Sequence, residues 1–116
     1  MKDTTQLKKL CTDNGLTGDD LWDCHGNWIL KHDGVAKIAH KQHIQLVKID
    51  VINSTDSLVR CLVTMKKGDV EISTFGEADK SNCKSKYLGC MAEKRGHDRA
   101  VLKLINAYQY GIYSEV

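Results

Sequence analysis

Six cations fall within twenty positions of this sequence, between residues 84 and 103, and they are the residues best suited to bind a ligand. They are Lys84, Lys86, Lys94, Arg95, Arg99 and Lys103. Ammonium and guanidinium groups contact phosphate oxygens through charge-assisted hydrogen bonds, so this cluster is typical of a phosphate-binding surface. A run of charges is equally typical of a solvated helix face. The residue types alone leave both interpretations open.

Five cysteines and five histidines raise the question of a metal site, but their spacing does not favour one. No Cys-x-x-Cys pair occurs, and Cys83 and Cys90 lie seven positions apart. His40 and His43 could share one face at a helix end, yet two ligands do not make a structural zinc site. We therefore predict no metal ion and no cofactor. The odd number of scattered cysteines indicates reduced thiols rather than disulfides.

Familiar catalytic and nucleotide-binding motifs do not occur in this sequence. It has neither a Gly-x-Ser-x-Gly elbow nor a glycine-rich loop of the P-loop or dinucleotide-binding type. Glu93 and Asp98 could serve as acid and base, but ion pairs with neighbouring cations on one helix explain them more simply. We predict that the protein is not an enzyme.

A helix over residues 87–108 would position the cations. At about 3.6 residues per turn, one face of this segment is largely apolar and the opposite face is basic. The predicted apolar face consists of Tyr87, Cys90, Lys94, His97, Val101, Leu104, Ile105 and Tyr108, and the basic face of Arg95, Arg99, Lys103 and Asn106. Lys94 and His97 stand out on the apolar face, because a polar group there needs a partner, a ligand or a route to solvent.

Three predicted strands precede this helix. Residues 44–52 and 58–65 are rich in β-branched side chains, and residues 70–75 follow after the turn signal at 66–69. Short polar clusters separate the strands, which favours an antiparallel meander. Residues 76–85 are predicted to be a polar connection to the helix.

The first part of the chain is predicted to contribute short helices. Residues 4–16 carry an apolar stripe at helical spacing and end near Asn-Gly, and residues 16–27 are expected to form a loop or a single turn. A short strand at 28–30 leads to a second helix that begins at Asp33 and stops near His43. The predicted fold class is therefore α+β: an antiparallel meander of three to four strands, covered on one face by a long C-terminal helix, with short N-terminal helices.

Length and composition are those of one globular domain. The 116 residues can enclose one core, so we predict a single domain over 1–116, with 1–27 as a peripheral segment and 28–116 as the main body. No apolar run reaches the roughly 20 residues of a membrane helix, and no secretory signal is recognised, so we expect a cytoplasmic protein. The net charge of +2 is small, so electrostatic binding must rest on local clustering.

Several short motifs resemble a known family. They are FGEA (75–78), a polar loop with Asn82, MAEKRGHDRAVLKL (91–104) and YSEV (113–116). Together they are similar to phage-encoded proteins of the single-strand DNA annealing superfamily of recombination, over residues 28–116. The resemblance implies a β-meander followed by a long helix, and binding of single-stranded DNA in a basic groove along a homo-oligomer. It also implies that the protein acts in the cytoplasm of a host cell without a cofactor.

The resemblance also implies a set of binding residues. The candidate DNA contacts are Lys94, Arg95, Arg99 and Lys103 on the helix, with Lys66 and Lys67 at a hairpin tip. Gly96 departs from the family pattern, since alanine would favour the helix by about 1 kcal/mol. The alternative hypothesis is a small phage protein that inhibits a host nucleic-acid or defence machine by binding a host protein through its basic helix or an uncovered sheet face.

Overall fold

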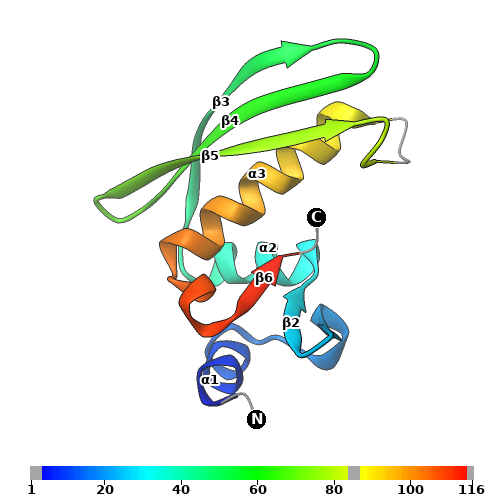
Figure 1. The fold of residues 1–116 in the computed structure, drawn as a ribbon. Coiled ribbons are helices and arrows are strands. Elements are labelled where there is room, and N and C mark those ends of the chain that lie inside the picture. The colour runs from blue at the N-terminus through cyan, green and yellow to red at the C-terminus, as the bar shows by residue number, and fades with distance from the viewer. Residues whose placement is uncertain (1–3, 84–86, 115–116) are drawn as a thin grey trace.

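The computed structural model describes residues 4–83 and 87–114, and in this part of the chain the fold is α+β (Figure 1). Two three-stranded sheets, three α-helices and two short 3-10 helices make up these ranges. The helices are α1 (Thr5–Asn14), α2 (His32–Lys41) and α3 (Leu88–Leu104), and the 3-10 helices are η1 (Gly18–Asp20) and η2 (Ala107–Tyr110). The larger sheet contains β3 (Gln45–Ser54), β4 (Leu58–Lys67) and β5 (Val70–Asp79), and the smaller sheet contains β1 (Leu21–Cys24), β2 (Asn27–Leu30) and β6 (Ile112–Ser114).

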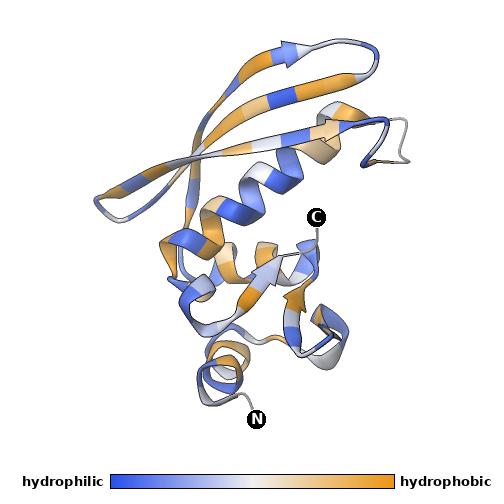
Figure 2. Cartoon of the chain, in the orientation of Figure 1, coloured by the Kyte–Doolittle hydropathy of each residue, from blue (hydrophilic) through white to orange (hydrophobic). Residues whose placement is uncertain are grey.

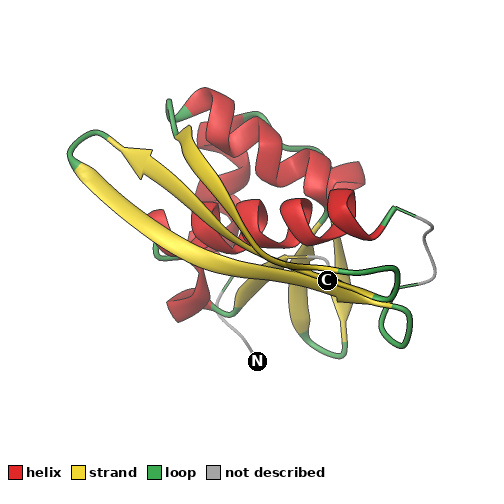
Figure 3. Cartoon of the chain, turned by 90° about the horizontal axis from the view of Figure 1, so that it is seen from above, coloured by secondary structure: helices red, strands yellow, loops and turns green. Residues whose placement is uncertain are grey.

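The larger sheet is an antiparallel meander with β4 between β3 and β5. α3 contacts β4 and β5, and the helices lie behind the long strands when the molecule is seen from above (Figure 3). Strand β5 is longer than predicted, because residues 76–79, expected in a polar connection, continue its alternation of buried and exposed side chains. Gly76 and Ala78 are buried, while Glu77 between them is exposed.

α3 contacts the sheet through residues that have little or no side chain. Gly96 of α3 faces Gly76 of β5 so closely that a Cβ built on Gly76 would lie 1.8 Å from the carbonyl oxygen of Ala92. Ala92 and Ala100 are fully buried. The hydroxyl of Thr74 donates to the carbonyl oxygen of Gly96 at 2.6 Å, which fixes the crossing point. The helix therefore lies unusually close to β5.

The apolar face predicted for this helix is wrong in its first half, whereas Val101 is buried and Leu104, Ile105 and Tyr108 pack against the core as predicted. Tyr87, Cys90 and Lys94 are exposed, whereas Arg95 and Asp98 are buried. Glycine and alanine do not mark a buried face by their hydropathy, so a contact built on them is not visible in the sequence pattern. The two buried charged residues are accommodated because both form hydrogen bonds inside the fold.

The predicted helix over residues 87–108 is also too long. α3 ends at Leu104, and Asn106 has a left-handed φ of 57°. Asparagine tolerates this conformation better than most residues with a side chain. The turn at Asn106 redirects the chain into η2 and then β6.

The smaller sheet joins early and late parts of the chain. β1 and β2 form a hairpin through His25 and Gly26, both of which have positive φ. β6 pairs with β2 in parallel, with Ile112 opposite Trp28. The prediction of a loop or turn for residues 16–27 misses β1, and no strand was expected for β6. Strands of three or four residues have too few positions to show a recognisable alternation.

One hydrophobic core connects α2, α3 and both sheets. Its largest fully buried apolar side chains are Leu30, Val35, Ile38, Val63, Met65, Val101, Leu102 and Ile112. Figure 2 shows apolar segments on these elements and also on β3, although most β3 residues are exposed. No helix among the described residues combines the length and hydropathy needed to cross a membrane.

Candidate functional site

Arg95, a predicted DNA contact, lies inside the protein. Its side chain is buried, and Nη1 donates to the carbonyl oxygen of Glu77 at 2.8 Å and to Oδ1 of Asn82 at 3.0 Å. Nη2 donates to the carbonyl oxygen of Asn82 at 3.1 Å. Nε is buried and has no partner among the described residues. Arg95 therefore connects α3 to β5 and to the turn that follows β5.

Arg99 lies one helical turn after Arg95 and is only partly buried. Its Nη1 donates to the carbonyl oxygen of Phe75 at 2.8 Å and lies 3.7 Å from Oε1 of Glu77. The side chain of Arg99 is 29% exposed, so part of it remains accessible to a ligand. Among the predicted contacts on α3, Arg99 is the one that a described hydrogen bond orients and that remains partly exposed.

Two surface hollows meet at Arg99, and we call their combined surface the Arg99 groove. One hollow is lined by Glu77, Asn82, Arg95 and Arg99, and the other by Asn27, Ile29, Arg99, Tyr108, Tyr113 and Ser114. The groove runs from the edge of β5 across α3 to the smaller sheet. Its lining combines two guanidinium groups, one carboxylate, amide groups and aromatic rings.

Two tyrosines form the aromatic end of the Arg99 groove. The rings of Tyr108 and Tyr113 are 5.8 Å apart between centroids, and Tyr113 is 40% exposed. Burial raises the pKa of Tyr108 and outweighs the opposite effect of the nearby Arg99. The phenol therefore stays uncharged near neutral pH, which keeps this end of the groove free of negative charge.

The remaining predicted contacts do not line the Arg99 groove. Lys103 is exposed and continues the row of Arg95 and Arg99 by one helical turn. Lys94 is exposed elsewhere on the circumference of α3. Lys66 and Lys67 lie on β4, where the Nζ of Lys67 donates to Oε1 of Gln42 at 2.7 Å. Lys84 and Lys86 lie outside the described residues.

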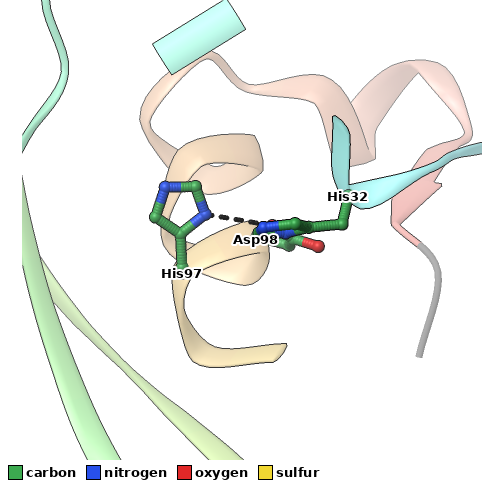
Figure 4. Close-up of side chains that lie close together, drawn as sticks. All are labelled: His32, His97 and Asp98. Carbon is green, nitrogen blue, oxygen red and sulfur yellow. Dashed lines mark hydrogen bonds and ion pairs between the residues drawn. The ribbon is translucent and has the colours of Figure 1, made fainter. Parts of the chain in front are cut away.

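A second polar cluster lies where α2 meets α3, and sequence reasoning missed it (Figure 4). Oδ1 of the buried Asp98 lies 2.7 Å from Nδ1 of His32 and 3.0 Å from Nδ1 of His97. The two imidazole rings meet edge to face at 5.5 Å. Asp98 and His97 were each considered separately, but His32 is 66 positions away from Asp98 and gives no local signal.

The composition of this cluster also allows a divalent cation to be considered. The three ligand atoms lie within 4.8 Å of one another, and imidazole and carboxylate are common metal ligands. One carboxylate oxygen, however, already satisfies both histidines. A metal ion would have to replace both of these hydrogen bonds. The geometry therefore explains how a carboxylate is buried between two helices without a metal ion. His40 and His43, the pair considered in the sequence, are exposed and outside this cluster.

Comparison with known proteins gives no family for this chain: no protein-family model matches it, and neither a curated protein nor a solved structure is significantly similar. The functional argument therefore rests on the chain's own residues and geometry.

Proposed function

We propose that this protein binds single-stranded DNA without sequence preference in the Arg99 groove, and that it does so without catalysing a reaction. The observation that carries the proposal is the position of Arg99, a partly exposed guanidinium at the junction of two hollows. One of these hollows also contains the exposed ring of Tyr113. A cation beside an aromatic ring is the combination that non-specific single-strand binders use.

Arg99 supplies the contact to phosphate. A guanidinium has several N–H donors in one plane, and the hydrogen bond described for Arg99 uses Nη1 only. That bond to the carbonyl oxygen of Phe75 holds the group against β5, so little side-chain freedom is lost when a phosphate binds. Charge-assisted bonds between arginine and phosphate are among the stronger hydrogen bonds in proteins.

Tyr113 supplies a surface on which a base stacks. Stacking of a base on an aromatic side chain contributes about 1–3 kcal/mol and tolerates any base, because every base has a π-face. Such contact requires bases that are not paired in a duplex. The small net charge of +2 gives little general attraction to either form of DNA, so binding must rest on the contacts within the groove.

Glu77 provides an internal test of the phosphate assignment. Its carboxylate lies 3.7 Å from Nη1 of Arg99, and its side chain is 48% exposed. A phosphate that approaches Arg99 must compete with this carboxylate and is repelled by it. Glu77→Gln removes the charge and keeps the shape, so DNA binding should become tighter. If phosphate does not bind beside Arg99, Glu77→Gln should not tighten DNA binding.

The experiment measures the anisotropy of a fluorescent thymidine oligonucleotide titrated with protein over a series of salt concentrations. Arg99→Ala should weaken binding by about tenfold, equivalent to about 1.4 kcal/mol, and reduce the magnitude of the salt slope by about 0.7 for one lost phosphate contact. Tyr113→Ala should weaken binding with no change in the salt slope. Lys8→Ala, on the exposed surface of α1, removes the same charge and serves as the matched control.

If Arg99→Ala and Lys8→Ala changed the affinity for the oligonucleotide equally, the Arg99 groove would not be the DNA-binding site. If the wild-type protein does not bind the oligonucleotide even at low salt, the alternative of a protein-binding module is favoured. In that case a purified partner with an acidic surface would be the next target to test.

A further inference from the structure

Strand β3 is an exposed edge that carries apolar side chains. It lies at one border of the larger sheet, and nine of its ten residues are exposed. The exposed fractions are 51% for Leu46, 42% for Val47, 65% for Val51 and 52% for Ile52. Proteins usually protect an edge strand by making it short, charged or bulged, or by covering it. The described part of the chain contains no element that covers this edge.

The opposite edge of the same sheet is protected. Arg99 donates to the carbonyl oxygen of Phe75, and Arg95 donates to the carbonyl oxygen of Glu77, both on β5. These two carbonyl groups would otherwise accept hydrogen bonds from an added strand. The sheet therefore has one edge that can extend and one that is blocked over its second half. A head-to-tail arrangement of β3 on β5 is disfavoured, and β3 can pair best with another β3.

The sequence of β3 is complementary to itself in the antiparallel direction. Counted outward from Ile49 as the centre, the positions that face each other across a two-fold axis are Lys48 with Asp50, Val47 with Val51, and Leu46 with Ile52. The apolar side chains meet apolar side chains, and each lysine meets an aspartate of the other copy. Within one chain, Nζ of Lys48 already lies 3.5 Å from Oδ2 of Asp50, so both charges occupy the same face of the strand.

The backbone of β3 is regular only over the centre of this register, and the pair of Leu46 and Ile52 lies outside that centre. Its pairing with β4 is irregular between Leu46 and Lys48 and between Val51 and Asn53, so the regular ladder spans the central residues. Lys48 and Asp50 pair with Thr64 and Leu62 there, which places them on the face away from α3. Opposite residues of an antiparallel pair share a face, so the two copies of α3 would lie on the same side of the joined sheet.

We propose that the protein forms a closed two-fold dimer through β3, in which two meanders become one continuous sheet with a β5 at each end. The occupant of the exposed edge is thus a second copy of this chain. The interface is isologous, because the same strand is used by both copies. The arginines of α3 that donate to β5 block further growth, so the assembly stops at two copies. This inference is independent of the proposed DNA binding.

The test is sedimentation equilibrium of the full chain over a range of concentrations. The wild-type protein should have twice the 13.0 kDa mass of one chain. In the proposed dimer, position 48 of each copy faces position 50 of the other. Asp50→Lys therefore makes both of these pairs lysine with lysine, and Lys48→Asp makes both aspartate with aspartate. Each change should raise the dissociation constant of the dimer at least about tenfold, since like charges directly opposite each other are destabilising. Both sites are exposed, and circular dichroism should show an unchanged monomer fold.

Two further samples separate the proposed register from a general loss of solubility or folding. An equimolar mixture of the Asp50→Lys and Lys48→Asp proteins should form a heterodimer, because every opposed pair then has opposite charges. The doubly substituted chain, Lys48→Asp with Asp50→Lys, should dimerise like the wild type. A wild-type protein that remains monomeric at the highest concentration would overturn the proposal. So would a larger assembly, or a dimer that neither single substitution weakens.

Discussion

The guanidinium of Arg95 donates to the carbonyl oxygen of Glu77 over 2.8 Å in the interior of the protein, whereas the next arginine in the same helical row is partly open to solvent. Arg95 and Arg99 thus have different tasks although they are equivalent in the sequence pattern. Arg95 holds the turn after β5 against α3. Arg99 combines an edge contact with an accessible charge.

Substitution of the two arginines should have different effects on stability. Arg95→Ala removes three hydrogen bonds and leaves the carbonyl oxygens of Glu77 and Asn82 without their donor, so we expect a loss of about 2–4 kcal/mol in the free energy of unfolding. Arg99→Ala should cost less than about 1 kcal/mol, because its contact is near solvent. Urea denaturation gives both values. Similar losses for the two variants would contradict this division.

Because of the close contact between Gly76 and Gly96, we expect alanine substitutions at the two positions to destabilise the protein to different extents. Gly76→Ala should lower the free energy of unfolding by at least about 3 kcal/mol or prevent folding, because the new Cβ would lie 1.8 Å from a backbone oxygen that cannot move aside. Gly96→Ala should cost about 1–3 kcal/mol, since its Cβ would meet the side chain of Val63 at 2.5 Å. Thermal unfolding measures the order of the two.

Gly89 on the same helix is the matched control for this series. A Cβ on Gly89 meets no described atom within 4 Å, so Gly89→Ala should leave stability unchanged or raise it by up to about 1 kcal/mol through helix propensity. If Gly89→Ala were as harmful as Gly96→Ala, the close approach of α3 to β5 would not be the cause.

Asp20 predicts a dependence of stability on pH. The backbone N–H of Thr17 and the ammonium of Lys37 donate to its buried carboxylate and lower the pKa of Asp20. Because the folded pKa lies below the unfolded value of about 3.9, the stabilisation is present above that pH and is lost as pH falls through the folded pKa. The Asp20→Asn protein should therefore have a lower free energy of unfolding than the wild type at neutral pH. The difference in free energy of unfolding between the two proteins should become smaller below about pH 4.

Unfolding of both proteins in urea between neutral and acidic pH tests this dependence. Asp69→Asn, in the turn between β4 and β5, removes the same charge from an exposed position and serves as the control. A constant difference between wild type and Asp20→Asn at every pH would argue against a pKa effect and for a change in packing alone.

The pair formed by His32 and Asp98 should be coupled energetically. Asp98→Ala is expected to cost about 1–3 kcal/mol, since it removes the acceptor from two histidines. The double variant with His32→Ala should cost less than the sum of the single changes by about 0.5 kcal/mol or more. His40→Ala, exposed on the same helix, should change stability little and show no coupling to Asp98.

The long strands of this fold could be predicted from the sequence, whereas the contacts that position the candidate site could not. β-branched runs and turn clusters predict β3, β4 and the start of β5, because each element carries its own signal over many residues. The end of β5 escapes prediction, since Gly76 and Glu77 look like loop residues until a helix backbone lies against them.

The candidate site shows the same limit. The sequence predicts the row of Arg95, Arg99 and Lys103 but cannot show which of these residues the fold buries. The sequence cannot place Tyr113 beside Arg99, because the strand of Tyr113 pairs with residues near Trp28. His32 and Asp98 likewise become neighbours only when α2 is placed beside α3.

The parallel pairing of β2 with β6 has a consequence for the order of folding. It joins Trp28 to Ile112 and so closes the long segment between them into a loop, whereas the meander joins strands that follow one another directly. Closing a long loop costs more chain entropy than closing a hairpin, so we expect β6 to associate after the meander and α3. An intermediate with α3 already in place would contain Arg99 but lack the ring of Tyr113. The last strand to arrive thus completes the groove.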